Sequence, residues 1–283
     1  MDGILLVNKE KGVTSRDVVN KISKQFKTKK VGHAGTLDPL ATGLLIICIN
    51  RATKIVEIIT GYEKEYIATV KLGIKTDTGD LEGNIIEEKT IKVNKKQTQK
   101  LIDSFQKKYM QKVPLYSAVR VDGKKLYEYA RNNEEVELPE REVEIKKIEL
   151  LEFDEENQTF SFKTTVSKGT YIRSLVEDIA EELNTVGTMT DLIRTKQGEY
   201  KIEDAKILDD IEKSDAKEII TGLSQFKKII IDEESIKSGK IIENNYTEEK
   251  VLFVNEKNEP LAIYKVYEKD NTKMKPWKVF KLE

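Results

Sequence analysis

Apolar and polar positions recur along this chain with the periods of strands and helices. Between residues 66 and 72, Tyr, Ala, Val and Leu alternate with Ile, Thr and Lys. This alternation predicts a strand with one face in the core. Val18, Ile22 and Phe26 recur every four residues, which predicts a helix with one apolar face. The chain therefore contains elements of both kinds.

Further patterns complete a mixed prediction. A helix is expected to begin near Thr14 or Ser15, because their side-chain oxygens can cap free backbone N–H groups. The other expected elements are a buried strand at 44–49, a short helix at 52–59, a strand at 66–72, a helix at 95–108, a tight turn at 122–123, strands at 143–153 and 160–166, and a helix after Gly169. Together they predict an α+β fold, a mostly antiparallel mixed sheet with surrounding helices.

The pattern changes towards the C-terminus. Short apolar segments occur at 229–231, 250–254, 261–267 and 277–280, and Gly239, Pro260 and Pro276 separate them. Several short strands at this spacing predict a small β-barrel. We therefore expect two units, a larger domain at 1–228 and a second module at 229–283.

Composition adds limits on the class of protein. The chain has 283 residues, 35% of them charged, and no apolar run of the length that a membrane span needs. The first residues carry an acid at Asp2 and a run of only four apolar residues, which does not resemble a signal peptide. The single cysteine, Cys48, excludes an internal disulfide. These features predict a cytoplasmic protein without a membrane segment.

Charge is distributed unevenly along the chain. The net charge is −1 at pH 7, which by itself does not favour binding to nucleic acid. Residues 21–30 nevertheless carry five lysines and no acid, whereas acidic residues gather at 134–144. Local potential, more than net charge, steers an anionic partner. A lysine run is equally typical of a solvated face.

One loop carries candidate chemistry. Residues 32–45 read GHAGTLDPLATGLL and place Asp38 on a glycine-bounded loop before the buried strand. Pro39 disfavours a helical backbone at Asp38. A carboxylate among small and apolar neighbours is costly to bury unless a partner compensates its charge. A carboxylate in such a place often has a function, which makes Asp38 a functional candidate. The alternative is an ordinary turn aspartate, since Asp-Pro is a common turn dipeptide.

This segment closely resembles the active-site motif of the TruB family of tRNA pseudouridine synthases. Further family motifs resemble the segments GILLVNK at 3–9, KEY at 64–66, TDTGD at 76–80, PLYSA at 114–118, GKKLYEYAR at 123–131 and SKGTYIRSL at 167–175. The resemblance covers residues 3–200 well, and the C-terminal module resembles the family's PUA module more loosely. Two positions depart from the family pattern: Glu10 replaces a proline, and Ile193 replaces an arginine.

The resemblance implies the catalytic residues. Asp38 is expected to be the nucleophile, at C1′ of the ribose or at C6 of the uracil. Arg173 is expected to pair with Asp38 and keep its carboxylate ionised. Tyr66 is expected to stack on the target uracil and to exchange a proton with the substrate. No metal or other cofactor is implied.

The resemblance also implies how the substrate is bound. Tyr171 and Leu192 are expected to wall the pocket, His33 to pack near the target nucleotide, and Lys9 to make a contact at the pocket edge. The implied substrate is uridine 55 in the T loop of tRNA, extruded from its stack and recognised within the T-arm stem-loop. We expect a monomer that requires no protein partner.

Three other functions remain open at this stage. The first is an RNA-guided pseudouridine synthase, which shares the aspartate motif. The second is a non-catalytic RNA-binding protein or tRNA folding chaperone, although Asp38, Tyr66 and Arg173 together argue for catalysis. The third is a sugar-processing enzyme with paired carboxylates, which needs two placed acids, whereas the sequence offers one in a credible pocket.

Overall fold

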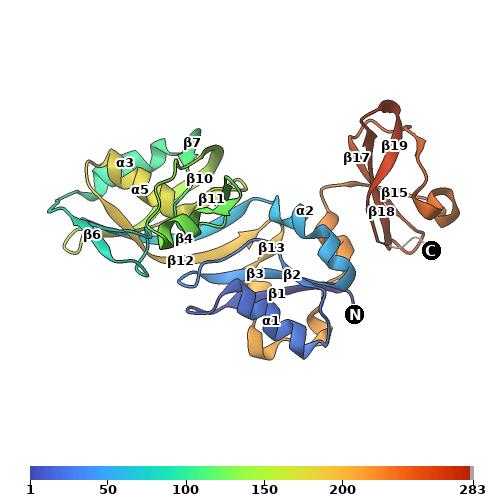
Figure 1. The fold of residues 1–283 in the computed structure, drawn as a ribbon, viewed down its shortest axis with the longest axis horizontal. Coiled ribbons are helices and arrows are strands. Elements are labelled where there is room, and N and C mark those ends of the chain that lie inside the picture. The colour runs from blue at the N-terminus through green and yellow to red at the C-terminus, as the bar shows by residue number, and fades with distance from the viewer. Residues whose placement is uncertain (281–283) are drawn as a thin grey trace.

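Two β-sheets organise the chain in the computed structural model, which describes residues 1–280 (Figure 1). The larger sheet has the strand order β14-β1-β3-β12-β4-β11-β10-β7, with β2 added to β3 and β13 added to β12. Its strands are β1 (Gly3–Lys9), β2 (Val31–His33), β3 (Thr42–Ile49), β4 (Lys64–Leu72), β7 (Lys108–Lys112), β10 (Glu140–Asp154), β11 (Thr159–Val166), β12 (Gly187–Gln197), β13 (Tyr200–Lys201) and β14 (Lys206–Ile207).

Helices and two hairpins surround this sheet. The α-helices are α1 (Ser15–Gln25), α2 (Val56–Thr60), α3 (Lys95–Ser104), α4 (Leu126–Arg131) and α5 (Ile172–Glu182). Short 3-10 helices are η1 (Asn50–Ile55), η2 (Ile202–Asp204), η3 (Leu208–Asp210), η4 (Lys213–Asp215), η5 (Ile219–Leu223) and η6 (Glu233–Gly239). The hairpins pair β5 (Ile74–Thr76) with β6 (Ile85–Glu88), and β8 (Arg120–Val121) with β9 (Lys124–Lys125).

The prediction of a mostly antiparallel mixed sheet with surrounding helices is confirmed. Within the larger sheet, β1 with β14 and β12 with β3 pair in parallel, and the other pairs are antiparallel. Long β12 and β4 join the half that carries α3 and α5 to the half that carries α1 and α2 (Figure 1). The large sheet is therefore continuous across both halves of the molecule.

Local patterns explain why these elements form. In β4, alternate residues are buried, beginning with Lys64 and Tyr66, as the alternation predicted. Helix α1 begins after Thr14, whose side chain accepts from the backbone of Asp17 while Asp17 bonds back to Thr14. This capping box satisfies two free backbone donors at the helix start. The apolar face, including Val18 and Ile22, is buried.

Two predictions were wrong in detail, and one long strand was missed. The helix expected at 95–108 ends at Ser104, because residues 108–112 form β7 and pair with β10. Strand β12 was not predicted, since its threonines and charged residues obscure the alternation. Pro276 does not separate two strands but lies inside β19, next to an irregular register with β18 that tolerates a missing N–H.

The smaller sheet lies at the C-terminus and has the order β15-β17-β18-β19-β16. Its strands are β15 (Lys227–Ile230), β16 (Ile242–Glu243), β17 (Lys250–Val254), β18 (Pro260–Tyr267) and β19 (Asp270–Val279). Apolar residues of this sheet, including Leu252 and Ile263, share a buried cluster with Ile219 and Ile220 of η5. A salt bridge of 2.9 Å between Lys278 and Glu57 adds a polar contact. The smaller sheet therefore packs against the larger unit.

Candidate active site

Asp38 lies on the loop that joins β2 to β3. Two glycines permit the course of this loop, Gly35 with φ +107° and Gly43 with φ +96°. At Gly43 the chain passes so close to β12 that an added Cβ would lie 2.4 Å from the carbonyl oxygen of Arg194. Glycine is therefore required where the loop enters the sheet.

Backbone contacts on both sides of Asp38 hold the loop. The Ser15 hydroxyl accepts a hydrogen bond of 2.9 Å from the N–H of Leu37 and donates one of 3.0 Å to its carbonyl oxygen. The carbonyl of Pro39 accepts from the N–H of Gly12 at 2.8 Å and from the Lys9 ammonium at 3.4 Å. The residues before and after Asp38 are thus both attached to the segment that begins α1.

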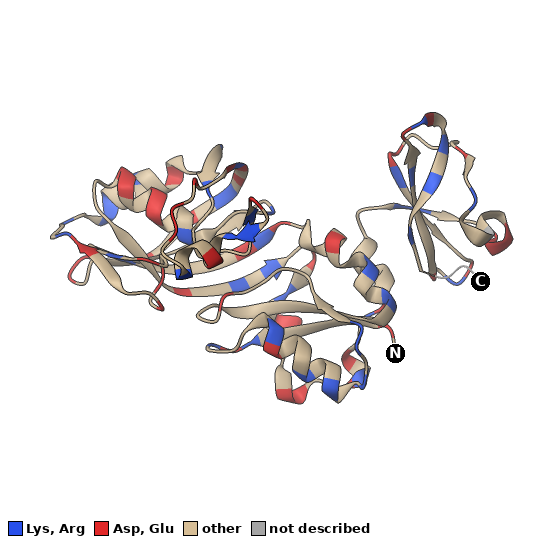
Figure 2. Cartoon of the chain, in the orientation of Figure 1, with Lys and Arg blue, Asp and Glu red and all other residues tan. Residues whose placement is uncertain are grey.

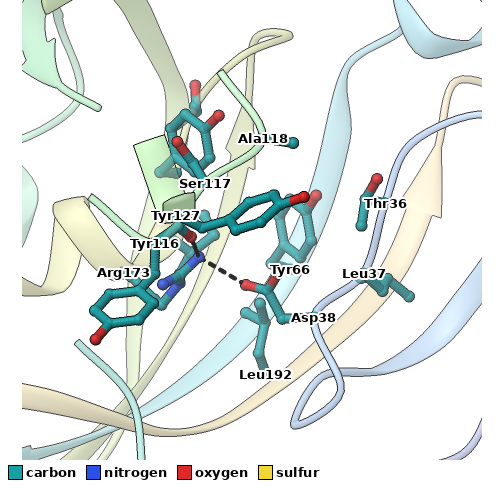
Figure 3. Close-up of a pocket in the computed structure, with 13 residues that line it drawn as sticks. Thr36, Leu37, Asp38, Tyr66, Tyr116, Ser117, Ala118, Tyr127, Arg173 and Leu192 are labelled. Carbon is teal, nitrogen blue, oxygen red and sulfur yellow. Dashed lines mark hydrogen bonds and ion pairs between the residues drawn. The ribbon is translucent and has the colours of Figure 1, made fainter. Parts of the chain in front are cut away.

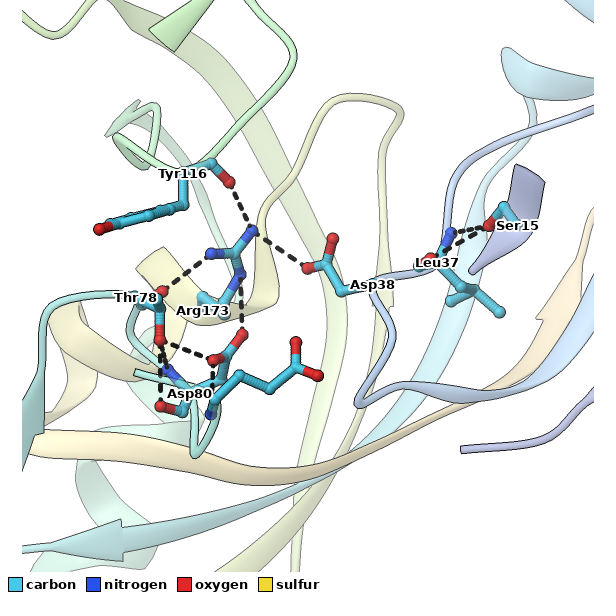
Figure 4. Close-up of polar contacts among 8 residues, drawn as sticks. Ser15, Leu37, Asp38, Thr78, Asp80, Tyr116 and Arg173 are labelled. Carbon is cyan, nitrogen blue, oxygen red and sulfur yellow. Dashed lines mark hydrogen bonds and ion pairs between the residues drawn. The ribbon is translucent and has the colours of Figure 1, made fainter. Parts of the chain in front are cut away.

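Arg173 pairs with Asp38, as predicted. The guanidinium comes from the first turn of α5, and its Nη2 lies 3.0 Å from Oδ2 of Asp38 (Figure 4). The same guanidinium donates to the carbonyls of Thr78, at 2.8 Å, and Tyr116, at 3.0 Å. The Arg173 side chain is 7% exposed and that of Asp38 is 38% exposed. The arrangement leaves the buried cation fixed and its carboxylate partner open to the cavity.

A second carboxylate, which the sequence analysis did not place, lies beside Arg173. Oδ2 of Asp80 is 3.8 Å from Nε of Arg173, and its side chain is 4% exposed. Asp80 also accepts hydrogen bonds from the Thr78 hydroxyl and the backbone N–H of Glu82. The TDTGD segment at 76–80 contained this residue, but no local pattern linked it to a distant arginine.

A cavity of about 370 Å³ opens beside the ion pair (Figure 3). It is lined by Thr36, Leu37, Asp38, Tyr66, Tyr116, Ser117, Ala118, Tyr127, Thr170, Tyr171, Ile172, Arg173 and Leu192. The structure thus brings together five of the residues that the sequence analysis selected, from the β2–β3 loop, β4, the start of α5 and β12. An ion pair in a largely apolar and aromatic cavity suits a flat, neutral ring above a carboxylate.

Two of the tyrosine rings that line the cavity have cationic side chains close to them. Lys125 and Arg131 each lie 5.2 Å from the ring centre of Tyr127, and Arg141 lies 5.5 Å from that of Tyr171. Cations placed over aromatic rings are attracted by the ring electrons. The sequence analysis did not name Tyr116 or Tyr127, although both lie in segments that it quoted, PLYSA and GKKLYEYAR.

Lys9 does not line the cavity. Its side chain is buried, at 1% exposure, and its ammonium donates to the carbonyls of Glu10 and Val13, at 2.9 and 2.6 Å, as well as to Pro39. Burial lowers the pKa of Lys9 to about 8, although Asp38 opposes the shift. Lys9 therefore holds the Asp38 loop through the carbonyl of Pro39, on the side away from the cavity.

His33 does not line the cavity either. It is the last residue of β2 and is half-buried, and its Nδ1 is buried without a hydrogen-bond partner among the described residues. Burial and the cations Arg16 and Arg194 lower its pKa. The imidazole is therefore neutral near pH 7, which suits packing against a ring.

Outside the cavity, basic and acidic residues are interspersed with one another. Figure 2 shows blue and red positions mixed over both units of the molecule. Within residues 1–280, no group of three or more His, Cys, Asp or Glu side chains is placed to hold a metal ion. No helix in that range is both long enough and apolar enough to cross a membrane.

Comparison with known proteins places the chain in a family. Residues 23–172, more than half of the chain, match the model of the TruB family pseudouridylate synthase N-terminal domain. The tRNA pseudouridine synthase B of Oceanobacillus iheyensis is 41% identical over 300 residues, covering 100% of this chain and 99% of that protein. The protein of the same name from Fusobacterium nucleatum is 46% identical, over 72% of this chain and 70% of its own length.

Solved structures agree on the fold. A chain of a Cbf5-Nop10-Gar1 complex superposes with a TM-score of 0.75 at 23% identity, covering 99% of this chain and 85% of that one. Identity this low supports the shared fold alone, whereas the sequence matches support the family. The chain belongs to the TruB family of pseudouridylate synthases, and it is an isomerase of that class.

Proposed function

We propose that this enzyme converts uridine 55 in the T loop of tRNA to pseudouridine, with Asp38 as its nucleophile. The ion pair between Asp38 and Arg173, set beside the cavity that Tyr66 lines, is the observation that carries the proposal. The names of the relatives, tRNA pseudouridine synthase B, support tRNA as the substrate.

The reaction is an isomerisation and balances without an added reagent. The bond between C1′ and N1 breaks, the uracil turns, and a new bond joins C1′ to C5. The proton of C5 is lost and N1 gains a proton, so the formula is unchanged. Asp38 would form a transient covalent bond at C1′ or at C6 and later leave as a carboxylate, since carboxylates serve well in both roles.

Arg173 and Tyr66 have distinct proposed roles. Arg173 would keep Asp38 ionised and aimed at the substrate, and its hydrogen bonds to two carbonyls fix its own position. Tyr66 would stack on the uracil and exchange a proton through its hydroxyl, since its side chain lines the cavity beside Asp38. Its place on a rigid central strand, β4, suits both tasks.

The target base must leave its stack to reach Asp38. Extrusion of a stacked nucleotide costs roughly a few kcal/mol. A cavity of about 370 Å³ walled by Tyr171 and Leu192 offers the extruded base an apolar site. His33 would pack near the nucleotide, and Lys9 would act indirectly, by holding the Asp38 loop through the carbonyl of Pro39.

We also propose separate roles for the two units of the chain. Residues 1–228 would form the catalytic domain, and residues 229–283 a PUA-like module that binds RNA outside the T-arm stem-loop. The separate five-stranded sheet supports this division. We also propose that the enzyme acts as a monomer without a protein partner.

The decisive experiment replaces the nucleophile. Asp38→Asn should abolish pseudouridine formation in a T-arm stem-loop, measured by mass mapping, while tRNA affinity stays within a few-fold. Asp77→Asn is the matched control, because Asp77 caps Asn84 in the β5–β6 turn and makes no ion pair with Arg173. Steady-state turnover by pure Asp38→Asn protein would refute the proposal.

A further inference from the structure

We propose that Ser15 is a positioning residue for Asp38, an inference that rests on the proposed role of Asp38 as nucleophile. Ser15 is the first residue of α1 and is 3% exposed. Its hydroxyl bonds to both the N–H and the carbonyl of Leu37, the residue directly before Asp38 (Figure 4). One side-chain oxygen thus fixes both backbone groups of a buried residue.

No other group replaces this contact. Among the described residues, the backbone N–H and carbonyl of Leu37 have Ser15 as their hydrogen-bond partner. The following residue, Pro39, is held differently, by the backbone N–H of Gly12 and the ammonium of Lys9. Because buried backbone groups need partners, loss of the Ser15 hydroxyl would release one side of the Asp38 loop while the other stayed fixed.

The contact acts on Asp38 at a distance. Ser15 does not line the cavity, so it cannot touch the substrate there. Asp38 must reach both Arg173, at 3.0 Å, and the reacting carbon, and a displacement of about 1 Å can lower a rate by about 10²-fold. The effect of removing the hydroxyl should therefore fall on the chemical step and leave RNA binding unchanged.

Thr14 provides a matched control on the same helix. Its side chain caps the first turn of α1 through the backbone of Asp17 and has no contact with Leu37. Thr14→Ala should loosen the start of α1, because it removes the cap, but leave the Asp38 loop anchored. A purely structural role for Ser15 predicts equal effects for the two variants.

The test measures two quantities on full-length protein, the single-turnover rate on a T-arm stem-loop and amide hydrogen exchange of the 32–45 segment. We expect Ser15→Ala to lower the rate by about 10²-fold with RNA affinity within a few-fold. Exchange at Leu37 should rise in Ser15→Ala and stay slow in Thr14→Ala. If Ser15→Ala does not fold, Ser15→Cys, with a weaker donor in a similar volume, should show an intermediate loss.

The outcomes separate this inference from the proposed function. Equal rates for Ser15→Ala and Thr14→Ala, with slow exchange at Leu37 in both, would overturn the role of Ser15 and leave that of Asp38 intact. Turnover by Asp38→Asn would instead overturn the proposed nucleophile. A fall in RNA affinity that accounts for the whole loss in Ser15→Ala would show that Ser15 shapes the binding surface, and would also overturn the inference.

Discussion

At the scale of single residues, the difference in burial around Arg173 separates two carboxylates. Asp80 lies behind the guanidinium and is as buried as the arginine, whereas Asp38 faces the cavity. A buried cation between two acids stays charged and fixed, because each nearby carboxylate favours the charged form of the guanidinium. Asp38 is therefore the member of the group that is free to meet a substrate.

Tyr66 gives the sharpest test at this scale. Tyr66→Phe keeps the ring, whose stacking on a base is worth roughly 1–3 kcal/mol, but removes the hydroxyl. We expect near-normal RNA affinity and a single-turnover rate lower by at least about 10²-fold, because proton transfer contributes about 10²–10⁴-fold. Tyr66→Leu, which also loses the ring, should bind RNA more weakly. A near wild-type rate for Tyr66→Phe would limit Tyr66 to stacking.

Lys9 predicts a dependence of stability on pH. Burial lowers its pKa in the folded protein from 10.5 to about 8, so the unfolded chain binds the additional proton between these values. The free energy of unfolding should therefore rise, relative to Lys9→Met, as pH increases from about 8 to about 10.5. The rise is at most about 3.5 kcal/mol, since one pKa unit corresponds to about 1.4 kcal/mol.

Urea titrations of wild type and Lys9→Met at several pH values measure this difference. Subtracting the free energy of unfolding of Lys9→Met from that of wild type cancels the contributions that all other groups make to both proteins. A difference that does not change across this range of pH would show that the three carbonyl acceptors of Lys9 offset its burial completely.

At the scale of elements, the turn between β5 and β6 brings a distant segment to the site. Thr78 and Asp80 lie in this turn and both contact Arg173. The turn is fixed internally, since the Thr76 and Thr78 hydroxyls bond to the carbonyl of Asp80. A hairpin far from Asp38 in sequence thereby sets the position of the arginine that pairs with it.

The turn predicts a role for Asp80. Asp80→Asn removes one of the two carboxylates around Arg173 and should lower the single-turnover rate by about 10-fold or more, because the guanidinium loses a charged partner that holds it. Asp77→Asn, in the same turn but without contact to Arg173, should leave the rate within a few-fold. Equal single-turnover rates for the two variants on the same stem-loop would show that Asp80 does not contribute to catalysis through Arg173.

At the scale of the whole molecule, the two sheets are packed together. Leu252 and Ile263 of the smaller sheet share a cluster with Ile219 and Ile220, and Lys278 pairs with Glu57. The smaller sheet therefore affects the stability of the larger unit as well as any contact with RNA.

Deletion of residues 229–283 should have two separable effects. The melting temperature should fall by several degrees, because apolar residues of η5 become exposed, and about 1 kcal/mol shifts it by about 2–4 °C in a chain of this size. Binding of full tRNA should weaken, while the folded fraction should remain active on a T-arm hairpin. Equal loss of activity on both substrates would assign the module a supporting role alone.

Local sequence patterns were sufficient to predict several elements and the family. Strong alternation predicted β4, capping residues predicted the start of α1, and the Asp122-Gly123 turn predicted the β8–β9 hairpin. The long motif around Asp38 resembled a single family, to which the chain belongs. These features are local, so neighbouring residues are sufficient to specify them.

The way in which distant segments meet depends on the packing of the whole chain. The family resemblance implied the pairing of Arg173 with Asp38, but not the contacts of Arg173 with Asp80 and the carbonyl of Tyr116, which form because α5, the β5–β6 turn and two loops converge at one place on the sheet. Ser15, which read as a candidate helix cap, instead holds Leu37. Such contacts depend on strand order and packing across long separations in sequence, and no pattern of neighbouring residues encodes them.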